Sequence, residues 1–226
     1  MIFHWLLAAS LISSVCAADP VSDARAAYET GRYPEAVRLA QAPANAGNAQ
    51  AQVLMGLMYQ HGRGVPADPR KAAEWYQKAA AQGDAAAQNN LGFLYERGAG
   101  VPQDFRQAKD WYERAARQGY PFAERNLAVL YETGRGVPHD PAEAFRWYRD
   151  AAEQGSRFAQ YKLGELFERG SGAPRDLVEA YKWYSLAAAR GDQPAADSAR
   201  RLEGVLTPRE IEEGKRRASG FSPKQP

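Results

Sequence analysis

Four glycine-rich segments are the first residues of this sequence whose type and spacing could do chemistry. Residues 62–66 read GRGVP and recur letter for letter at 134–138, with the variants GAGVP at 98–102 and GSGAP at 170–174. A glycine-rich loop can hold a phosphate on its backbone amides, but that motif follows a strand and ends in Gly-Lys-Ser/Thr. No copy here has that ending, so we interpret the segments as structural turns.

Other residue types could serve catalysis, but none forms a recognisable constellation. Glu96, Glu132 and Glu168 recur and could act as acid and base, although a solvated helix face is the ordinary explanation for such a recurrence. His61 and His139 are the only histidines after residue 18 and lack the H-E-x-x-H spacing of a zinc site. Neither S-x-x-K nor G-x-S-x-G provides a serine nucleophile. We therefore expect no cofactor, no metal site and no enzymatic activity.

Tryptophan–tyrosine pairs could form a platform on which sugar rings stack. Four such pairs stand at helical spacing with alanines, beginning at Trp75, Trp111, Trp147 and Trp183. Aromatic residues in this pattern belong to a hydrophobic core far more often than to a sugar site. We predict that the pairs are core residues.

All these features share one period. The tryptophans are 36 residues apart, as are the loop glycines Gly64, Gly100, Gly136 and Gly172. Self-similarity at a fixed period of this size is typical of a solenoid, in which each unit buries its apolar face only against its neighbours. The glycine segments are then turns that occur once per unit.

One unit, residues 84–119, shows the expected elements. Asp84 and Gly98 are suitable caps for a first amphipathic helix, helix A, and Asp104 and Gly119 for a second, helix B. The sequence thus predicts an all-α solenoid of αα-hairpin repeats, with four units over 48–191. A shorter variant hairpin is expected at 19–47, capping helices at 192–218 and a disordered tail at 219–226.

The repeated residues carry a resemblance to a known family. The segment AQNNLGFLYERGAGVPQDFRQAKDWYERAARQG, residues 87–119, resembles the Sel-one-like repeat (SLR), a relative of the tetratricopeptide repeat. The resemblance implies a right-handed α-solenoid and a non-catalytic scaffold or adaptor for protein–protein interactions, in bacteria often in the cell envelope. A weak hydrolase acting on β-lactam or cell-wall substrates is the alternative, because a few members are connected with penicillin binding. Those members are cysteine-rich, whereas Cys16 is the only cysteine here.

Variable positions of helix A are the candidate binding residues. Leu91, Gly92 and Leu94 represent positions that repeat, and we expect them to pack between helices. Variable positions spaced i, i+4 and i+8 fall on one stripe of the helix. The helix-A side of a solenoid is commonly concave and used for binding. We predict that a protein or peptide partner binds there, on Asn89, Phe93, Arg97, Arg125, Val129, Tyr161, Glu165 and Arg169.

Charge and the N-terminal segment bear on partners and location. With 29 basic and 27 acidic residues the formal net charge is +2, and the two signs are interleaved, which argues against a nucleic-acid partner. Residues 1–18 contain an apolar run followed by small residues, as a secretory signal peptide does. A retained anchor and a lipid on Cys16 are the alternatives. We expect an exported periplasmic or secreted protein without stable membrane insertion after cleavage.

Mass spectrometry of the protein from its native host checks this expectation. We expect a chain that begins at residue 18 or 19, because the small residues Ala17 and Ala18 form the cleavage site. An intact Met1, or a lipid on Cys16, would contradict it.

Overall fold

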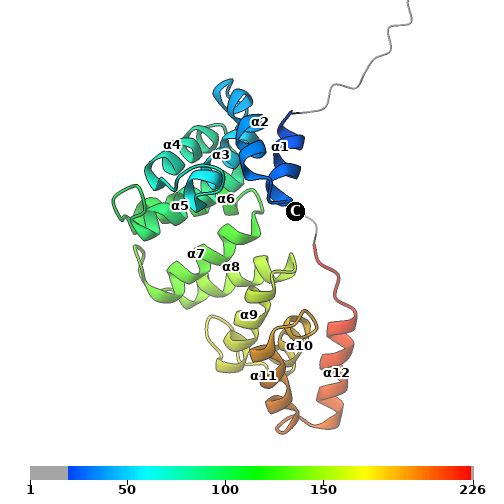
Figure 1. The fold of residues 1–226 in the computed structure, drawn as a ribbon. Helices are drawn as coiled ribbons and strands as arrows, with labels where there is room; N and C mark the ends of the chain where they lie inside the picture. Colours follow the sequence, from blue (N-terminus) through cyan, green and yellow to red (C-terminus); the bar gives the residue numbers. More distant parts are fainter. Residues whose placement is uncertain (1–19, 225–226) are drawn as a thin grey trace, which may run out of the picture.

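The protein is helical throughout the part that the structure describes. A computed structural model describes residues 20–224, which form twelve α-helices and no strand (Figure 1). This confirms the all-α class. The helices are α1 (Pro20–Glu29), α2 (Tyr33–Asn45), α3 (Ala49–His61), α4 (Pro69–Ala81), α5 (Ala85–Arg97), α6 (Phe105–Ala116), α7 (Pro121–Thr133), α8 (Pro141–Glu153), α9 (Arg157–Arg169), α10 (Leu177–Ala188), α11 (Gln193–Glu203) and α12 (Pro208–Ser219).

Successive hairpins stack into a curved α-solenoid (Figure 1). In the four repeats, helix A is α3, α5, α7 or α9, and helix B is α4, α6, α8 or α10. Each helix packs mainly against its neighbours in the chain. The apolar core is therefore a series of local clusters rather than one central cluster, as the period requires.

In the unit 84–119 the caps predicted at Asp84, Gly98 and Asp104 are present, whereas α6 ends at Ala116 with Arg117 as its C-cap, before the expected Gly119. The side chain of Asp104 accepts hydrogen bonds from the backbone amides of Arg106 and Gln107, and the other three B helices have an aspartate in the same role. Gly98 ends α5 in the left-handed conformation, at φ 68°. The Asp104 amide then donates to the Tyr95 carbonyl at 2.9 Å, which closes the loop between the two helices.

A buried tyrosine joins helix B to helix A in each repeat. The Tyr112 ring lies over Gly92, where a Cβ atom would approach it to 2.8 Å. Its hydroxyl donates to Oε2 of Glu96 at 2.8 Å. The same bond recurs at 2.7–2.9 Å from Tyr76 to Gln60, Tyr148 to Glu132 and Tyr184 to Glu168. Glu96 and its counterparts are thus partners of core hydroxyls, rather than the solvated residues that the sequence suggested.

The tryptophans differ from the tyrosines in burial. All four tyrosines are at most 1 % exposed, which confirms the core prediction for them. Trp75, Trp111 and Trp147 are only half-buried, whereas Trp183 is 4 % exposed. A cation lies over each indole ring at 4.2–4.8 Å. The tryptophans therefore line the outer surface of the B helices, which we call the B face.

The second glycine of each loop joins one repeat to the next. At Gly100 a Cβ atom would overlap the carbonyl of Pro69 and lie 2.6 Å from the amide nitrogen of Arg70, at the start of α4 in the preceding repeat. Its φ of 75° also favours glycine. Gly136 and Gly172 approach Phe105 and Pro141 in the same way.

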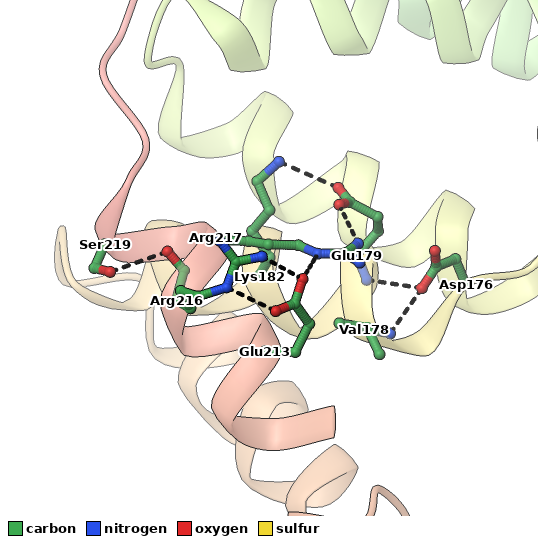
Figure 2. Close-up of polar contacts among 8 residues, drawn as sticks. All are labelled: Asp176, Val178, Glu179, Lys182, Glu213, Arg216, Arg217 and Ser219. Carbon is green, nitrogen blue, oxygen red and sulfur yellow. Dashed lines mark hydrogen bonds and ion pairs between the residues drawn. The ribbon is translucent and has the colours of Figure 1, made fainter. Parts of the chain in front are cut away.

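The C-terminal helices cover the last repeat. Arg217 of α12 pairs at 2.7 Å with both Glu213 and Glu179, and so ties α12 to α10 (Figure 2). The chain then continues to Lys224 along the B face. A disordered tail is expected from the sequence for residues 219–226, whereas Phe221 packs against Trp183 in the structure.

The expected signal segment lies outside the described residues, as do residues 225–226. Within 20–224, no helix is both long and apolar enough to span a bilayer.

Substitution of Gly100 by alanine should test the contact between repeats. We expect a loss of about 2–4 kcal/mol in the free energy of unfolding, from a strained φ combined with steric overlap against a neighbouring backbone. Gly83→Ala is the matched control, because Gly83 also has a positive φ, 92°, but nothing within 4 Å of its Cβ position. Urea denaturation of the two variants measures the difference; equal losses would show that the contact is unimportant.

Candidate functional site

The A-face stripe is the name we give to the eight predicted partner-binding residues. Asn89, Phe93 and Arg97 lie on α5, Arg125 and Val129 on α7, and Tyr161, Glu165 and Arg169 on α9. The structure divides them into residues that hold the helices together and residues that are accessible.

Asn89, Phe93 and Val129 contribute to packing, as Tyr161 also does. Asn89 is 8 % exposed, and its Oδ1 accepts a hydrogen bond at 3.0 Å from Nδ2 of Asn126 on the next A helix. Phe93 and Val129 are half-buried and pack against core clusters. The guanidinium of Arg97 lies 5.4 Å from the centre of the Phe93 ring. Of the three stripe residues on α5, Arg97 is therefore the one that is accessible to a partner.

A group of charged side chains surrounds Glu165 on α9. Its carboxylate accepts hydrogen bonds from the Tyr161 hydroxyl and Arg169, both at 3.3 Å, and from Lys162 at 3.0 Å. Burial opposes the charged form of Lys162, but Glu132 and Glu165 outweigh it and raise its pKa. The Tyr161 ring packs 5.7 Å from that of Tyr184, so Tyr161 also supports the core.

Among the residues of the stripe, Arg125 is the one that lies next to strongly exposed apolar side chains. Its guanidinium lies 5.6 Å from the ring centres of both Phe122 on α7 and Phe158 on α9. These two rings are 55 % and 41 % exposed, which is unusual for phenylalanine. Phe122, Arg125 and Phe158 form what we call the Phe–Arg–Phe cluster.

A surface cavity of about 400 Å³ adjoins the Phe–Arg–Phe cluster. The cluster lines it together with Pro121, Gly155 and Arg157. Phe122 and Phe158 are not among the residues predicted from the sequence, although the sequence contains a signal for them. They occupy the second position of helix A, where the first two repeats have Gln50 and Ala86.

A buried polar layer connects consecutive hairpins. Gln88 is 5 % exposed; its Nε2 donates to the Ala80 carbonyl at 3.3 Å, and its Oε1 accepts from Gln118 at 2.8 Å. Gln52 and Gln160 make the corresponding donations to Ala44 and Ala152.

Glu124 replaces this glutamine in the third repeat. It is 3 % exposed and accepts from Gln154 at 2.8 and 2.9 Å, but an ionised carboxylate cannot donate to a carbonyl. Burial raises its pKa to about 7, against the lowering effect of the Gln154 bond, and Asp150 raises it further. Glu124 has the most strongly raised pKa of the carboxylates in the described residues, yet no second carboxylate shares a proton with it in a catalytic pair.

The described part of the chain contains no group of three or more histidine or acidic residues placed to hold a metal ion. Glu96, Glu132 and Glu168 stand one per repeat, each bonded to its own tyrosine. The arrangement offers surfaces for recognition instead.

Comparison with sequence families gives four matches in the register of the 36-residue period. The family profile described as Sel1 repeat matches residues 49–84, 85–120, 121–156 and 157–192. No curated protein matches the chain.

Solved structures with the same architecture include two bacterial repeat proteins. A Sel1 repeat protein from Oxalobacter formigenes is 32% identical, with a TM-score of 0.76, over 88% of this chain and 83% of that one. The protective antigen c5321, an SLR-fold protein of uropathogenic Escherichia coli, is 28% identical with a TM-score of 0.77 over 88% of this chain. The present chain spans 45% of the length of c5321. The immunity protein Pa5087 from Pseudomonas aeruginosa shares the fold, at 21% identity and a TM-score of 0.53.

Glu124→Gln should stabilise the protein in a pH-dependent way. Because the folded pKa of Glu124, about 7, exceeds its ordinary value of 4.5, the folded chain binds more protons between these two values. The contribution of the protonated Glu124 carboxyl to the free energy of unfolding is fully present below about pH 4.5. This contribution is lost as the pH rises through about 7, because the buried carboxyl then ionises. We expect the variant to gain about 1–3 kcal/mol in unfolding free energy at pH 8 and little at pH 5.

Urea denaturation of both proteins across this pH range measures the gain. Gln88→Glu is the reciprocal control, since it places a carboxylate in the same layer one repeat earlier and should lose stability at pH 8. A gain from Glu124→Gln that is equal at pH 5 and pH 8 would contradict the assignment.

Proposed function

Because the chain belongs to the Sel1 repeat family, whose members are generally scaffolds for protein–protein interactions, we propose that it is a non-catalytic scaffold or adaptor that binds a partner protein along the A-face stripe. We further propose that it works in the bacterial cell envelope after export, a location that rests on the signal-like residues 1–18.

The Phe–Arg–Phe cluster is the observation that carries the proposal. Two phenylalanines are exposed beside each other on consecutive A helices, at positions that the fold does not require to be aromatic. Exposed apolar groups rimmed by polar ones mark interaction sites. Aromatic and arginine side chains also dominate the binding energy of interfaces.

The cluster also indicates the chemistry of the partner. The polar partner of Arg125 in the described chain is the amide oxygen of Asn126, at 3.1–3.3 Å, which is neutral. Its positive charge is thus available to a carboxylate. A partner that presents an apolar side chain next to an aspartate or glutamate would match both the rings and the guanidinium.

No observation favours the hydrolase alternative. The recurring glutamates that could act as acid and base are hydrogen-bonded to core tyrosines, and they are separated by one repeat each. Their geometry supports the fold rather than a reacting substrate.

Site-specific photo-crosslinking in the native host can identify the partner. A photoreactive phenylalanine analogue at position 158 should capture it, because the ring at this position is exposed in the cluster. The same analogue at Gln77, an exposed position of helix B, is the control and should not capture it.

With the partner in hand, Arg125→Ala and Phe158→Ala should each weaken binding by about 1–3 kcal/mol. We expect little change in melting temperature, because Phe158 is 41 % exposed and Arg125 is partly exposed. Val205→Ala is the matched control, since it removes a 66 % exposed apolar side chain elsewhere. Titration calorimetry provides the affinities. Normal binding by both variants, with loss on substitution of the B face, would show that the partner uses the other side.

A further inference from the structure

The segment after α12 lies across the B face without belonging to a helix. The Phe221 ring packs edge-on against Trp183, with ring centres 5.4 Å apart. Three residues later, the Lys224 amide donates to the carbonyl of Glu153, the last residue of α8, at 2.8 Å. The Lys224 ammonium also pairs with the Glu153 carboxylate. An aromatic ring and a lysine thus anchor an extended segment across α10 and α8.

Glu153 is particular to this repeat. The corresponding positions of the other three repeats are Ala81, Arg117 and Ala189, so the fold does not require a carboxylate there. The cation paired with Glu153 in the described chain is Lys224 of the C-terminal segment. The site for a lysine therefore exists in one repeat alone.

Two other cations close to this segment, Arg217 and Lys182, are already paired with carboxylates. Arg217 pairs with Glu179 and Glu213, and Lys182 pairs with Glu179 at 3.2 Å (Figure 2). Neither of them pairs with Glu153, whose cation in the described chain is Lys224. A basic ligand would meet little repulsion from them.

Two cavities flank Glu153. The first, about 310 Å³, lies between the C-terminal segment and Trp183; the second, about 340 Å³, continues past Lys224 to Trp147 and Asp150. The indole Nε1 atoms of both tryptophans are buried and have no hydrogen-bond partner among the described residues. Trp183 lines the first cavity and Trp147 the second, so both indoles lie next to an occupant of the cavities. We call the two cavities together the B-face groove.

We propose that the B-face groove is a binding site for an extended peptide of a partner protein that carries an aromatic residue three positions before a lysine. The chain's own residues 221–224, Phe-Ser-Pro-Lys, occupy it in the free protein and compete with that partner. The proline keeps its preceding residue extended, and the occupant covers only part of the groove. This site is separate from the A-face stripe and does not depend on the function proposed above.

A labelled peptide of the chain's own terminus tests the groove in trans. The probe is fluorescein-ASGFSPKQP, residues 218–226, added to the full-length protein and followed by fluorescence anisotropy. The full-length variant Phe221→Ala/Lys224→Ala should bind it about tenfold or more tightly than the unaltered protein, because a tethered competitor has a high effective concentration.

Glu153→Ala, added to that variant, should abolish binding of the probe. Alanine occupies this position in two other repeats, so the variant should fold. Glu143→Ala on the same helix, outside both cavities, is the matched control and should bind normally. A probe with alanine in place of its phenylalanine and lysine should bind the double variant about tenfold or more weakly, since anchors dominate such contacts.

Three outcomes would overturn the proposal. The first is equal affinity of the unaltered protein and the double variant for the probe. The second is undiminished binding of the alanine-substituted probe. The third is a dimer of the unaltered protein that Phe221→Ala/Lys224→Ala dissociates, which would make a second copy the occupant. The variant Phe122→Ala/Phe158→Ala should leave probe binding unchanged. The proposal for the B-face groove and the proposal for the A-face stripe can therefore be refuted separately.

Discussion

The contact between a tyrosine ring of helix B and the small residue beneath it on helix A determines how close the two helices of a repeat can lie. Gly92 leaves room for the Tyr112 ring, and the ring's hydroxyl must then find a partner because it is buried. Glu96 supplies that partner from the same helix as the glycine. Ring, glycine and acceptor thus form one unit of packing, and the loops and outer faces are arranged around it.

Much of this architecture follows from the sequence because it is local. The 36-residue period, the aspartate caps and the left-handed glycines such as Gly98 are each decided within a few residues, and the structure has them where the sequence predicts them. The partner of Glu96 could not be read in this way, because a recurring exposed-type residue looks the same whether it faces solvent or a hydroxyl. Helical periodicity alone also did not separate the buried tyrosines from the half-buried tryptophans beside them.

The two candidate surfaces were predictable to different degrees. The A-face stripe follows from positions that vary between repeats, although Asn89 and Tyr161 also take part in packing. Phe122 and Phe158 stand out only when corresponding positions are compared across all four repeats. The B-face groove depends on Lys224 reaching Glu153, 71 residues earlier in the chain, and no local pattern contains a contact of that range.

The contact of Gly100 with the preceding repeat has a consequence for how such a protein evolves. The glycine meets the backbone of Pro69 and Arg70, and its counterpart Gly172 meets the backbone of Pro141 in the same place. A joint made mainly with main-chain and Cβ atoms depends little on which side chains the neighbour carries. Gene recombination that duplicates or removes a whole repeat therefore preserves every joint, while the surface residues of each copy remain free to diverge toward new partners.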